Sequence, residues 1–145
     1  MITVRQILEK KGSDVHSVGP EMTVYDALKV MAQKNVGAVL VRSGGTLVGI
    51  LSERDYARKV ILLGKASKET PVGEIMTSKI VYARPDLTAT EALALMTDKH
   101  IRHLPVMEQE RLIGVVSIGD LVKAIISEQE FNIRQLENYI IGPGH

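Results

Sequence analysis

The chain has 145 residues, of which 45% are apolar, so a packed globular interior is expected rather than disorder. Eighteen Lys and Arg against 17 Asp and Glu leave a net charge of +1, which argues against a nucleic-acid footprint or a polybasic membrane anchor. Cysteine is absent, so disulfides, thiolate catalysis and cysteine-ligated zinc are excluded.

The same sequence predicts a soluble cytoplasmic protein. No apolar run reaches the ~18 residues that span a bilayer. The stretch 1–12 has its charges on the wrong side of too short an apolar segment for a signal peptide. Four Tyr, one Phe and no Trp leave few rings for stacking on bases, so nucleic acid is not an expected partner.

The first half of the chain predicts a β-α-β-β-α succession. A short extended piece precedes a helix that begins after Thr23, an N-cap residue with Asp26 three positions on. A β-branched run, a Ser-Gly-Gly turn and a second apolar run predict a hairpin, and a helix closed by Gly64 follows it. The predicted strands and the last helix are 14–18, 36–42, 46–52 and 53–63.

The second half predicts the same succession. Thr88 and Glu91 form a capping box at the start of its first helix. The predicted strands and the last helix are 79–83, 101–107, 112–117 and 118 to about 129. Beyond them, the tail 127–140 carries Phe131, Ile133, Leu136 and Ile140 in an imperfect amphipathic helix. This helix either packs on its own module or clasps a second copy.

The two halves are an internal repeat. Shifted by 65 residues, the chain matches itself without a gap from Pro20 and Pro85 to Ile61 and Ile126. This predicts an α/β fold of two tandem βαββα repeats packed with pseudo-two-fold symmetry, because one unit of about 60 residues buries little surface alone. The predicted boundaries are 1–63 for the first repeat, 64–71 for the linker, 72–127 for the second repeat, and 128–145 for the C-terminal helix and tail.

One phrase, glycine, two aliphatics, serine, two variable residues and aspartate, ends the hairpin in each repeat. It reads GILSERD at 49–55 and GVVSIGD at 114–120. One interpretation is a helix N-cap, in which the serine and the acid satisfy free amides. The other is a ligand site, because a carboxylate at a helix start can accept both hydroxyls of a ribose while nearby amides hold a phosphate. Duplication alone does not distinguish the two.

The sequence gives little support to an enzymatic function or to a metal site. No phosphate-binding loop, dinucleotide fingerprint or nucleophile elbow occurs, so we expect no catalytic residues. The four histidines show no zinc-binding spacing, and we expect no metal. They are His16, His100, His103 and His145.

The βαββα unit, the duplicated phrase and the run IRHLPV at 101–106 resemble cystathionine β-synthase (CBS) domains. These occur as tandem pairs called Bateman modules, and the resemblance covers roughly residues 1–127. It implies a stand-alone CBS protein that binds adenosyl compounds (AMP, ADP, ATP, NAD or S-adenosylmethionine) in clefts between the repeats. It also implies a homodimer of modules in a flat disc.

Carried over residue by residue, the resemblance assigns the ribose to Asp55 and Asp120, with Ser52 and Ser117 beside them. The resemblance also implies that Arg102 and His103 face the nucleotide phosphates. The alternative for this pair is a solvated rim, since burying either is costly without an anion. Gly37 and Ala38 stand at the matching places, so the two sites should be unequal.

The remaining carried-over residues come from the segment that precedes the first strand of the opposite repeat. The Asp55 site would take Thr77, Lys79 and Val81. Its phosphate donor, if there is one, would come from the stretch ERDYARK, that is from Arg54, Arg58 or Lys59. For Arg58 and Lys59, on the same helix, an exposed face is the expected role. The Asp120 site would take the region of Val15 and His16, and Ile101 would contact the base. Each repeat is preceded by a lead-in segment, VRQIL at 4–8 and VGEIM at 72–76. The connection after the first lead-in is three residues longer than the one after the second, which makes the two sites more unequal.

The sequence therefore favours a non-enzymatic regulatory module that binds an adenine nucleotide and relays its occupancy to an effector protein. The basic pair makes S-adenosylmethionine the less favoured ligand at the second site. The alternative is a structural or protein-interaction module with empty clefts. A nucleic-acid-binding role is disfavoured by the charge and the few aromatic residues.

Overall fold

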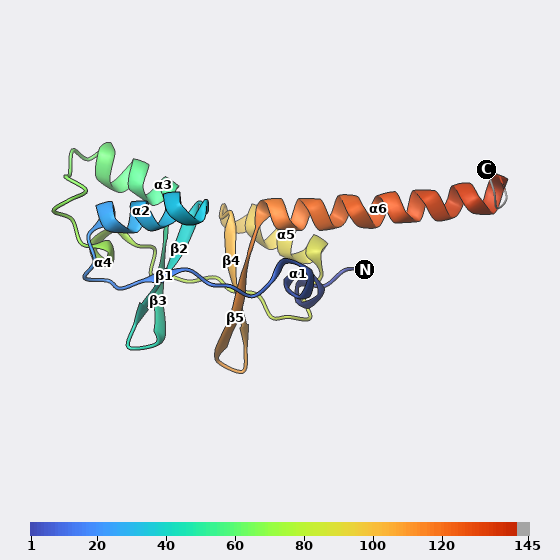
Figure 1. Cartoon of the computed structure of the whole chain (residues 1–145), viewed down its shortest axis with the longest axis horizontal. Helices are drawn as coiled ribbons and strands as arrows, with labels where there is room; N and C mark the ends of the chain where they lie inside the picture. Colours follow the sequence, from blue (N-terminus) through green and yellow to red (C-terminus); the bar gives the residue numbers. More distant parts are fainter. Residues whose placement is uncertain (142–145) are drawn as a thin grey trace. The chain divides into compact units, whose positions relative to one another are not determined.

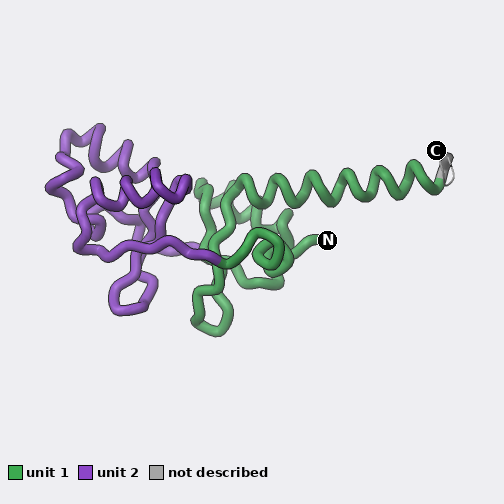
Figure 2. Tube along the Cα trace, in the orientation of Figure 1, with its two compact units in different colours: residues 1–13, 82–145 green, residues 14–81 purple. Residues whose placement is uncertain are grey.

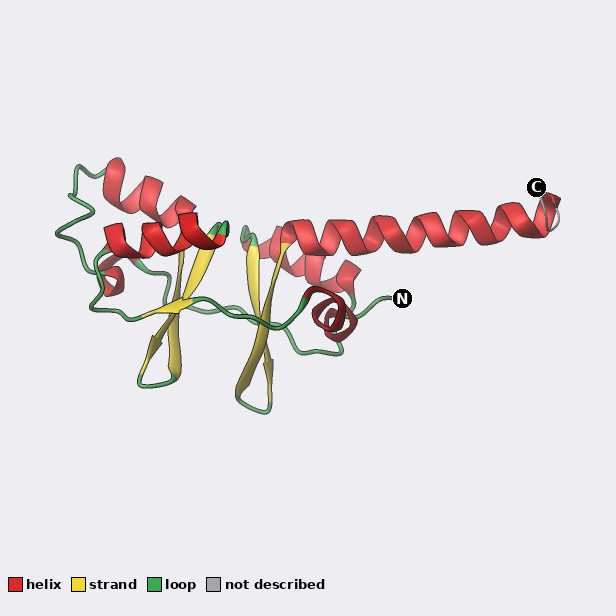
Figure 3. Cartoon of the chain, in the orientation of Figure 1, coloured by secondary structure: helices red, strands yellow, loops and turns green. Residues whose placement is uncertain are grey.

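The computed structural model describes residues 1–141, and the chain forms two compact units (Figure 2). Unit 1 contains Met1–Ser13 and the chain from Tyr82 onward, and unit 2 contains Asp14–Val81. Both units mix helices and strands (Figure 3), so the predicted α/β class is confirmed.

Unit 2 holds a three-stranded sheet covered by helices (Figure 1). Strand β1 is parallel to β2, and β2 is antiparallel to β3. The N-cap Thr23 starts α2 by accepting the Asp26 N–H, as its spacing predicted. The elements are β1 (Ser17–Val18), α2 (Val24–Lys34), β2 (Ala38–Ser43), β3 (Thr46–Ser52), α3 (Glu53–Tyr56), the π-helical turn η1 (Ala57–Ile61) and α4 (Val72–Ile75).

Unit 1 repeats the hairpin and its two helices. The strand predicted at 79–83 is wrong in extent, because only a single parallel bridge joins Ala83 to Val106. The capping box of Thr88 and Glu91 is present at the start of α5, as predicted. The elements are α1 (Val4–Lys11), α5 (Ala89–Lys99), β4 (His103–Glu108), β5 (Arg111–Ser117) and α6 (Ile118–Ile141).

The two hairpins match down to their irregularities. Each has a register shift at the same place in the repeat, after Val41 in β2 and after Val106 in β4. The first turn uses Gly44 and Gly45, both at positive φ, as a tight hairpin turn requires. The second turn holds Gln109 and Glu110 at positive φ (49° and 66°), a conformation that non-glycine residues adopt at a cost.

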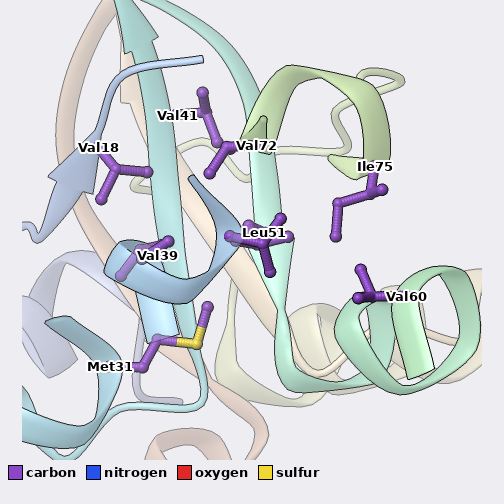
Figure 4. Packing of buried hydrophobic residues seen from close by; sticks show 10 residues of the cluster. Val18, Met31, Val39, Val41, Leu51, Val60, Val72 and Ile75 are labelled. Carbon is purple, nitrogen blue, oxygen red and sulfur yellow. The ribbon is translucent and has the colours of Figure 1, made fainter. Parts of the chain in front are cut away.

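The core of unit 2 contains side chains from both halves of the sequence. Val39, Val41 and Leu51 of the hairpin pack with Val72 and Ile75 of α4, and all five are at most 2% exposed (Figure 4). Helix α4 is the lead-in to the second sequence repeat. It nevertheless completes the core of the unit formed by the first repeat.

Helix α1 does the converse in unit 1. Its buried residues Val4, Ile7 and Leu8 pack in the unit formed by the second repeat, and the Val4 N–H donates to the Leu87 carbonyl at 2.8 Å. The segment that leads into each repeat thus packs in the unit formed by the other repeat. The compact units therefore differ from the contiguous blocks of the sequence repeat in which segment leads into each hairpin.

Helix α6 is one continuous helix of 24 residues. The sequence predicted two helices that met near residue 128, and this division is wrong, because no helix-breaking residue lies between Asp120 and Ile141. Every described side chain from 129 to 139 is exposed, including Phe131, Ile133 and Leu136. Residues 142–145, with His145, lie outside the described part of the chain. Within residues 1–141, no helix is both long enough and apolar enough to cross a membrane.

Candidate carboxylate sites at two helix starts

The duplicated phrase of unit 2 forms a reciprocal cap where β3 ends and α3 begins. The Asp55 N–H donates to Ser52 Oγ at 3.1 Å, and the Ser52 N–H donates to Asp55 Oδ2 at 3.0 Å. The Ser52 hydroxyl donates to the same oxygen at 3.1 Å. The N-cap interpretation of the sequence is therefore confirmed for this pair. The side chain of Asp55 is 12% exposed, so the carboxylate lies close beneath the surface.

The other oxygen of Asp55 accepts two more donors. Thr77 Oγ1 donates to Asp55 Oδ1 at 3.1 Å, and Lys59 Nζ lies 3.1 Å from the same atom. Lys59 also donates to the Ile75 carbonyl at 3.1 Å. The structure thus brings Thr77 to Asp55, two residues that the resemblance assigned to one site. The expectation that Lys59 lies on a merely exposed helix face is wrong, because its amino group reaches back to this carboxylate.

The glycine of the phrase makes room for the segment that carries Thr77. Backbone hydrogen bonds between Ile50 and Thr77, at 2.9 and 3.0 Å, hold this segment against β3. A Cβ added at Gly49 would lie 2.5 Å from Met76 Sδ and 3.1 Å from the Thr77 carbonyl oxygen. The absence of a side chain at Gly49 therefore permits the approach that places the Thr77 hydroxyl on Asp55.

Unit 1 repeats the cap with a different cation. The Ser117 N–H donates to Asp120 Oδ2 at 2.8 Å, and the Asp120 N–H donates to Ser117 Oγ at 3.2 Å. Lys11 Nζ, at the end of α1, donates to Asp120 Oδ2 at 2.6 Å. Burial raises the pKa of Asp120, but the hydrogen bonds from Lys11 and Ser117 outweigh it and hold this pKa below its ordinary value.

The basic pair of the second repeat lies at the entry to β4. His103 is paired with Ser117 in the register of β4 and β5, and the Arg102 carbonyl accepts the first N–H of α6 at 2.9 Å. Arg102 is exposed, whereas His103 and Ile101 are half-buried. The strand pairing thus brings Arg102 and His103 to the same helix start as Ser117 and Asp120.

For the other residues that the resemblance assigns to the two sites, contact with a ligand stays a prediction. Val15 and His16 belong to unit 2 and lead into β1, where the His16 carbonyl accepts the Leu40 N–H at 3.0 Å. Lys79 is exposed and Val81 is half-buried, in the segment that follows Thr77. Arg54 is exposed on the first turn of α3.

A pocket of about 610 Å³ lies in unit 2, between the end of α2, the entry to β2 and α3. Its wall includes Asn35, Gly37, Glu53 and Tyr56. None of the residues predicted to bind the ligand lines it, so its volume gives no support to the predicted site. Among residues 1–141, no three His, Asp or Glu side chains converge on a place that could hold a metal ion.

Two cations at these sites were missed by sequence reasoning. Lys59 follows Asp55 by four residues, a spacing that favours an ion pair on a helix, so the pattern could have revealed it. Lys11 and Asp120 are 109 residues apart, and only the exchange of the lead-ins brings them together. No sequence signal marks that pair.

The fold and the sites define a class of protein: tandem α/β repeats, each of which ends its hairpin in a helix capped by serine and aspartate. The chain belongs to the CBS domain family, whose model matches residues 1–61 and 72–127. The resemblance seen in the sequence is thereby confirmed.

Known relatives agree with this assignment. The CBS domain-containing protein CBSX3, mitochondrial, of Arabidopsis thaliana is 42% identical and covers 97% of this chain and 72% of its own. A solved candidate signal-transduction protein with CBS domains from Burkholderia ambifaria MC40-6 is 49% identical, with a TM-score of 0.84 over 88% of this chain and 96% of that one. The CBS domain pair of protein MJ0100, solved with 5′-methylthioadenosine and S-adenosyl-L-methionine, has a TM-score of 0.78 over 88% of this chain and 98% of that one. At 22% identity, this last likeness concerns the fold alone.

Proposed function

We propose that the chain is a non-enzymatic regulatory module that binds an adenine nucleotide (AMP, ADP, ATP or NAD) at Asp55 and Asp120 and relays its occupancy to an effector protein. The supporting observation is that each unit ends its hairpin in a half-buried or buried carboxylate at a helix start, with hydroxyl and amide donors around it. A carboxylate in this setting can accept the two hydroxyls of a ribose.

The basic pair supports a phosphorylated ligand at the second site. Arg102 and His103 lie beside the helix start that carries Asp120, and Arg102 is exposed. A guanidinium binds phosphate oxygens in two parallel hydrogen bonds. Gly37 and Ala38 offer no such donors in unit 2, so we infer stronger nucleotide binding through Asp120 than through Asp55.

Calorimetric titration with AMP, ADP, ATP, NAD and S-adenosylmethionine tests the proposal. Asp120→Ala should abolish the tighter binding event and Asp55→Ala the weaker one. Asp98→Ala is the matched control, because Asp98 is an exposed acid of α5 whose side chain is 76% exposed. Loss of binding in the control, or unchanged binding in both site variants, would contradict the assignment.

One observation favours the alternative, a structural or protein-interaction module. Both carboxylates already have internal partners, Lys59 and Thr77 in unit 2 and Lys11 in unit 1. Thermal unfolding at millimolar nucleotide separates the two functions. A bound nucleotide at 100 times its Kd stabilises the folded state by about 2.7 kcal/mol, whereas an interaction module shows no shift in Tm.

For assembly and location we propose a cytoplasmic homodimer, in which the exposed apolar face of α6 contacts a second copy. The four apolar side chains Val122, Ile126, Ile133 and Leu136 are separated by four, seven and three residues, which places them on one face of the helix, and they are 40 to 60% exposed. The Arabidopsis relative is named as mitochondrial, so the compartment is to be checked by fractionation.

A further inference from the structure

Lys11 contacts the carboxylate that the proposed function assigns to the ligand of unit 1. Its amino group donates to Asp120 Oδ2 and to the Val115 carbonyl, each at 2.6 Å. The same carboxylate oxygen also accepts the Ser117 N–H. A ribose hydroxyl that approaches Asp120 must therefore compete with an ammonium, whose charge makes it the stronger donor.

The position of Lys11 is fixed by the packing of α1. Leu8 lies over Gly114, where an added Cβ would be 2.7 Å from its Cδ2 atom. At the other end of α1, the Ile2 N–H donates to Glu128 Oε2 at 2.6 Å. Asp120 and Glu128 both belong to α6, about 12 Å apart along its axis at 1.5 Å per residue. The N-terminal segment is thus attached to α6 at two points, one of which is the Lys11–Asp120 pair.

The cation of unit 2 has a different origin. Lys59 lies four residues after Asp55 in the same helical segment, and its amino group also donates to the Ile75 carbonyl of α4. The residue that matches Lys59 in the second repeat is Ala124, which carries no charge. Displacing Lys11, in contrast, frees the last turn of a separate helix. The carboxylate is therefore coupled to α1 only in unit 1, whereas in unit 2 Thr77 joins Asp55 to the segment that follows α4.

We propose, on the basis of the proposed function, that Lys11 is an internal competitor for Asp120 and that a ligand binds there only by displacing it. Displacement detaches the C-terminal end of α1 from the start of α6. Ligand binding in unit 1 is thereby converted into a change at α1, which a partner can read. Binding at Asp55 does not release α1, because the donors that it displaces there, Lys59 and Thr77, do not belong to that helix.

The test titrates AMP into variants that carry Asp55→Asn, so that only the Asp120 site is measured. Lys11→Met removes the charge and keeps the side-chain length, and Lys10→Met is the matched control on the preceding residue of α1. We expect Lys11→Met to bind AMP about two- to fivefold more tightly, the range of an exposed ion pair, and Lys10→Met to bind as the parent does. Hydrogen exchange of the amides at 8–12 should rise when AMP binds the parent, and should be high in Lys11→Met without AMP.

The possible failures are distinguishable. If Lys11→Met binds AMP with unchanged or lower affinity, the competition is refuted while the proposed function stands. If none of AMP, ADP, ATP and NAD binds the Asp55→Asn parent, Lys11→Met or the wild type, the proposed function is refuted and the competition with it. If exchange at 8–12 is the same in Lys11→Met as in the parent without AMP, Lys11 does not hold α1 and the coupling is refuted.

Discussion

Gly49→Ala is the substitution whose effect follows most directly from the geometry. The added methyl would lie 2.5 Å from Met76 Sδ, 2.9 Å from Met76 Cγ and 3.1 Å from the Thr77 carbonyl oxygen. The Met76 side chain can swing aside, but the carbonyl oxygen is backbone and is held by the Ile50 N–H at 3.0 Å. The segment that carries the Thr77 hydroxyl must therefore shift away from β3 and from Asp55.

We expect Gly49→Ala to lower the free energy of unfolding by about 1–3 kcal/mol, the usual cost of overpacking a core. Gly114→Ala should cost less, because the three atoms nearest to its methyl belong to the Leu8 side chain and none of them is backbone. Gly119→Ala is the control of opposite sign, since its methyl meets nothing closer than 3.7 Å inside α6 and should stabilise by about 0.5–1 kcal/mol. Urea unfolding measures all three. Equal stability of Gly49→Ala and the wild type would refute the role of the glycine.

Three further predictions concern unit 1 and its helix. Burial raises the pKa of Asp120, but its hydrogen bonds lower it further, so the carboxylate stabilises the fold above its unfolded-state pKa. The wild type should exceed Asp120→Asn in stability at about pH 7, with the difference lost as the pH falls through the folded-state pKa; a constant difference in urea unfolding would contradict this. Glu110→Gly should stabilise by about 0.5–1 kcal/mol in thermal unfolding, because its φ of 66° favours glycine, and a lower Tm would refute the strain. Leu136→Glu should reduce the molar mass in light scattering and Asn138→Glu should not; equal masses would exclude pairing through α6.

The local elements were predictable because their signals are local. The strand 46–52 has its predicted ends, and the caps at Thr23 and Thr88 form at their predicted positions. The strand at 79–83 failed because alternation alone does not supply a partner, and only Ala83 bridges to β4. The division of α6 failed because the end of a sequence repeat was taken as the end of a helix.

The parts that could not be predicted depend on contacts between distant segments. The repeat shows that Leu8 and Met76 occupy related lead-ins, but not that each crosses to the other repeat's hairpin. Only the family resemblance assigned Thr77 to the Asp55 site, because no local pattern links residues 22 positions apart. Neither a local sequence pattern nor the family resemblance indicated Lys11.

The duplicated phrase has the same structural role in both units, so it cannot by itself give the two units different ligand preferences. Its glycine leaves room for the segment that leads into the other repeat, and its serine and aspartate cap a helix. A difference in ligand preference between the units must therefore come from residues around the phrase that the two copies do not share. The cation is one such residue, since it comes from the same helical segment in unit 2 and from α1 in unit 1. Exchanging Arg102 for the glycine found at position 37 should thus weaken phosphate binding through Asp120 while leaving the Ser117 cap intact, and loss of the cap would show that the two roles are not separable.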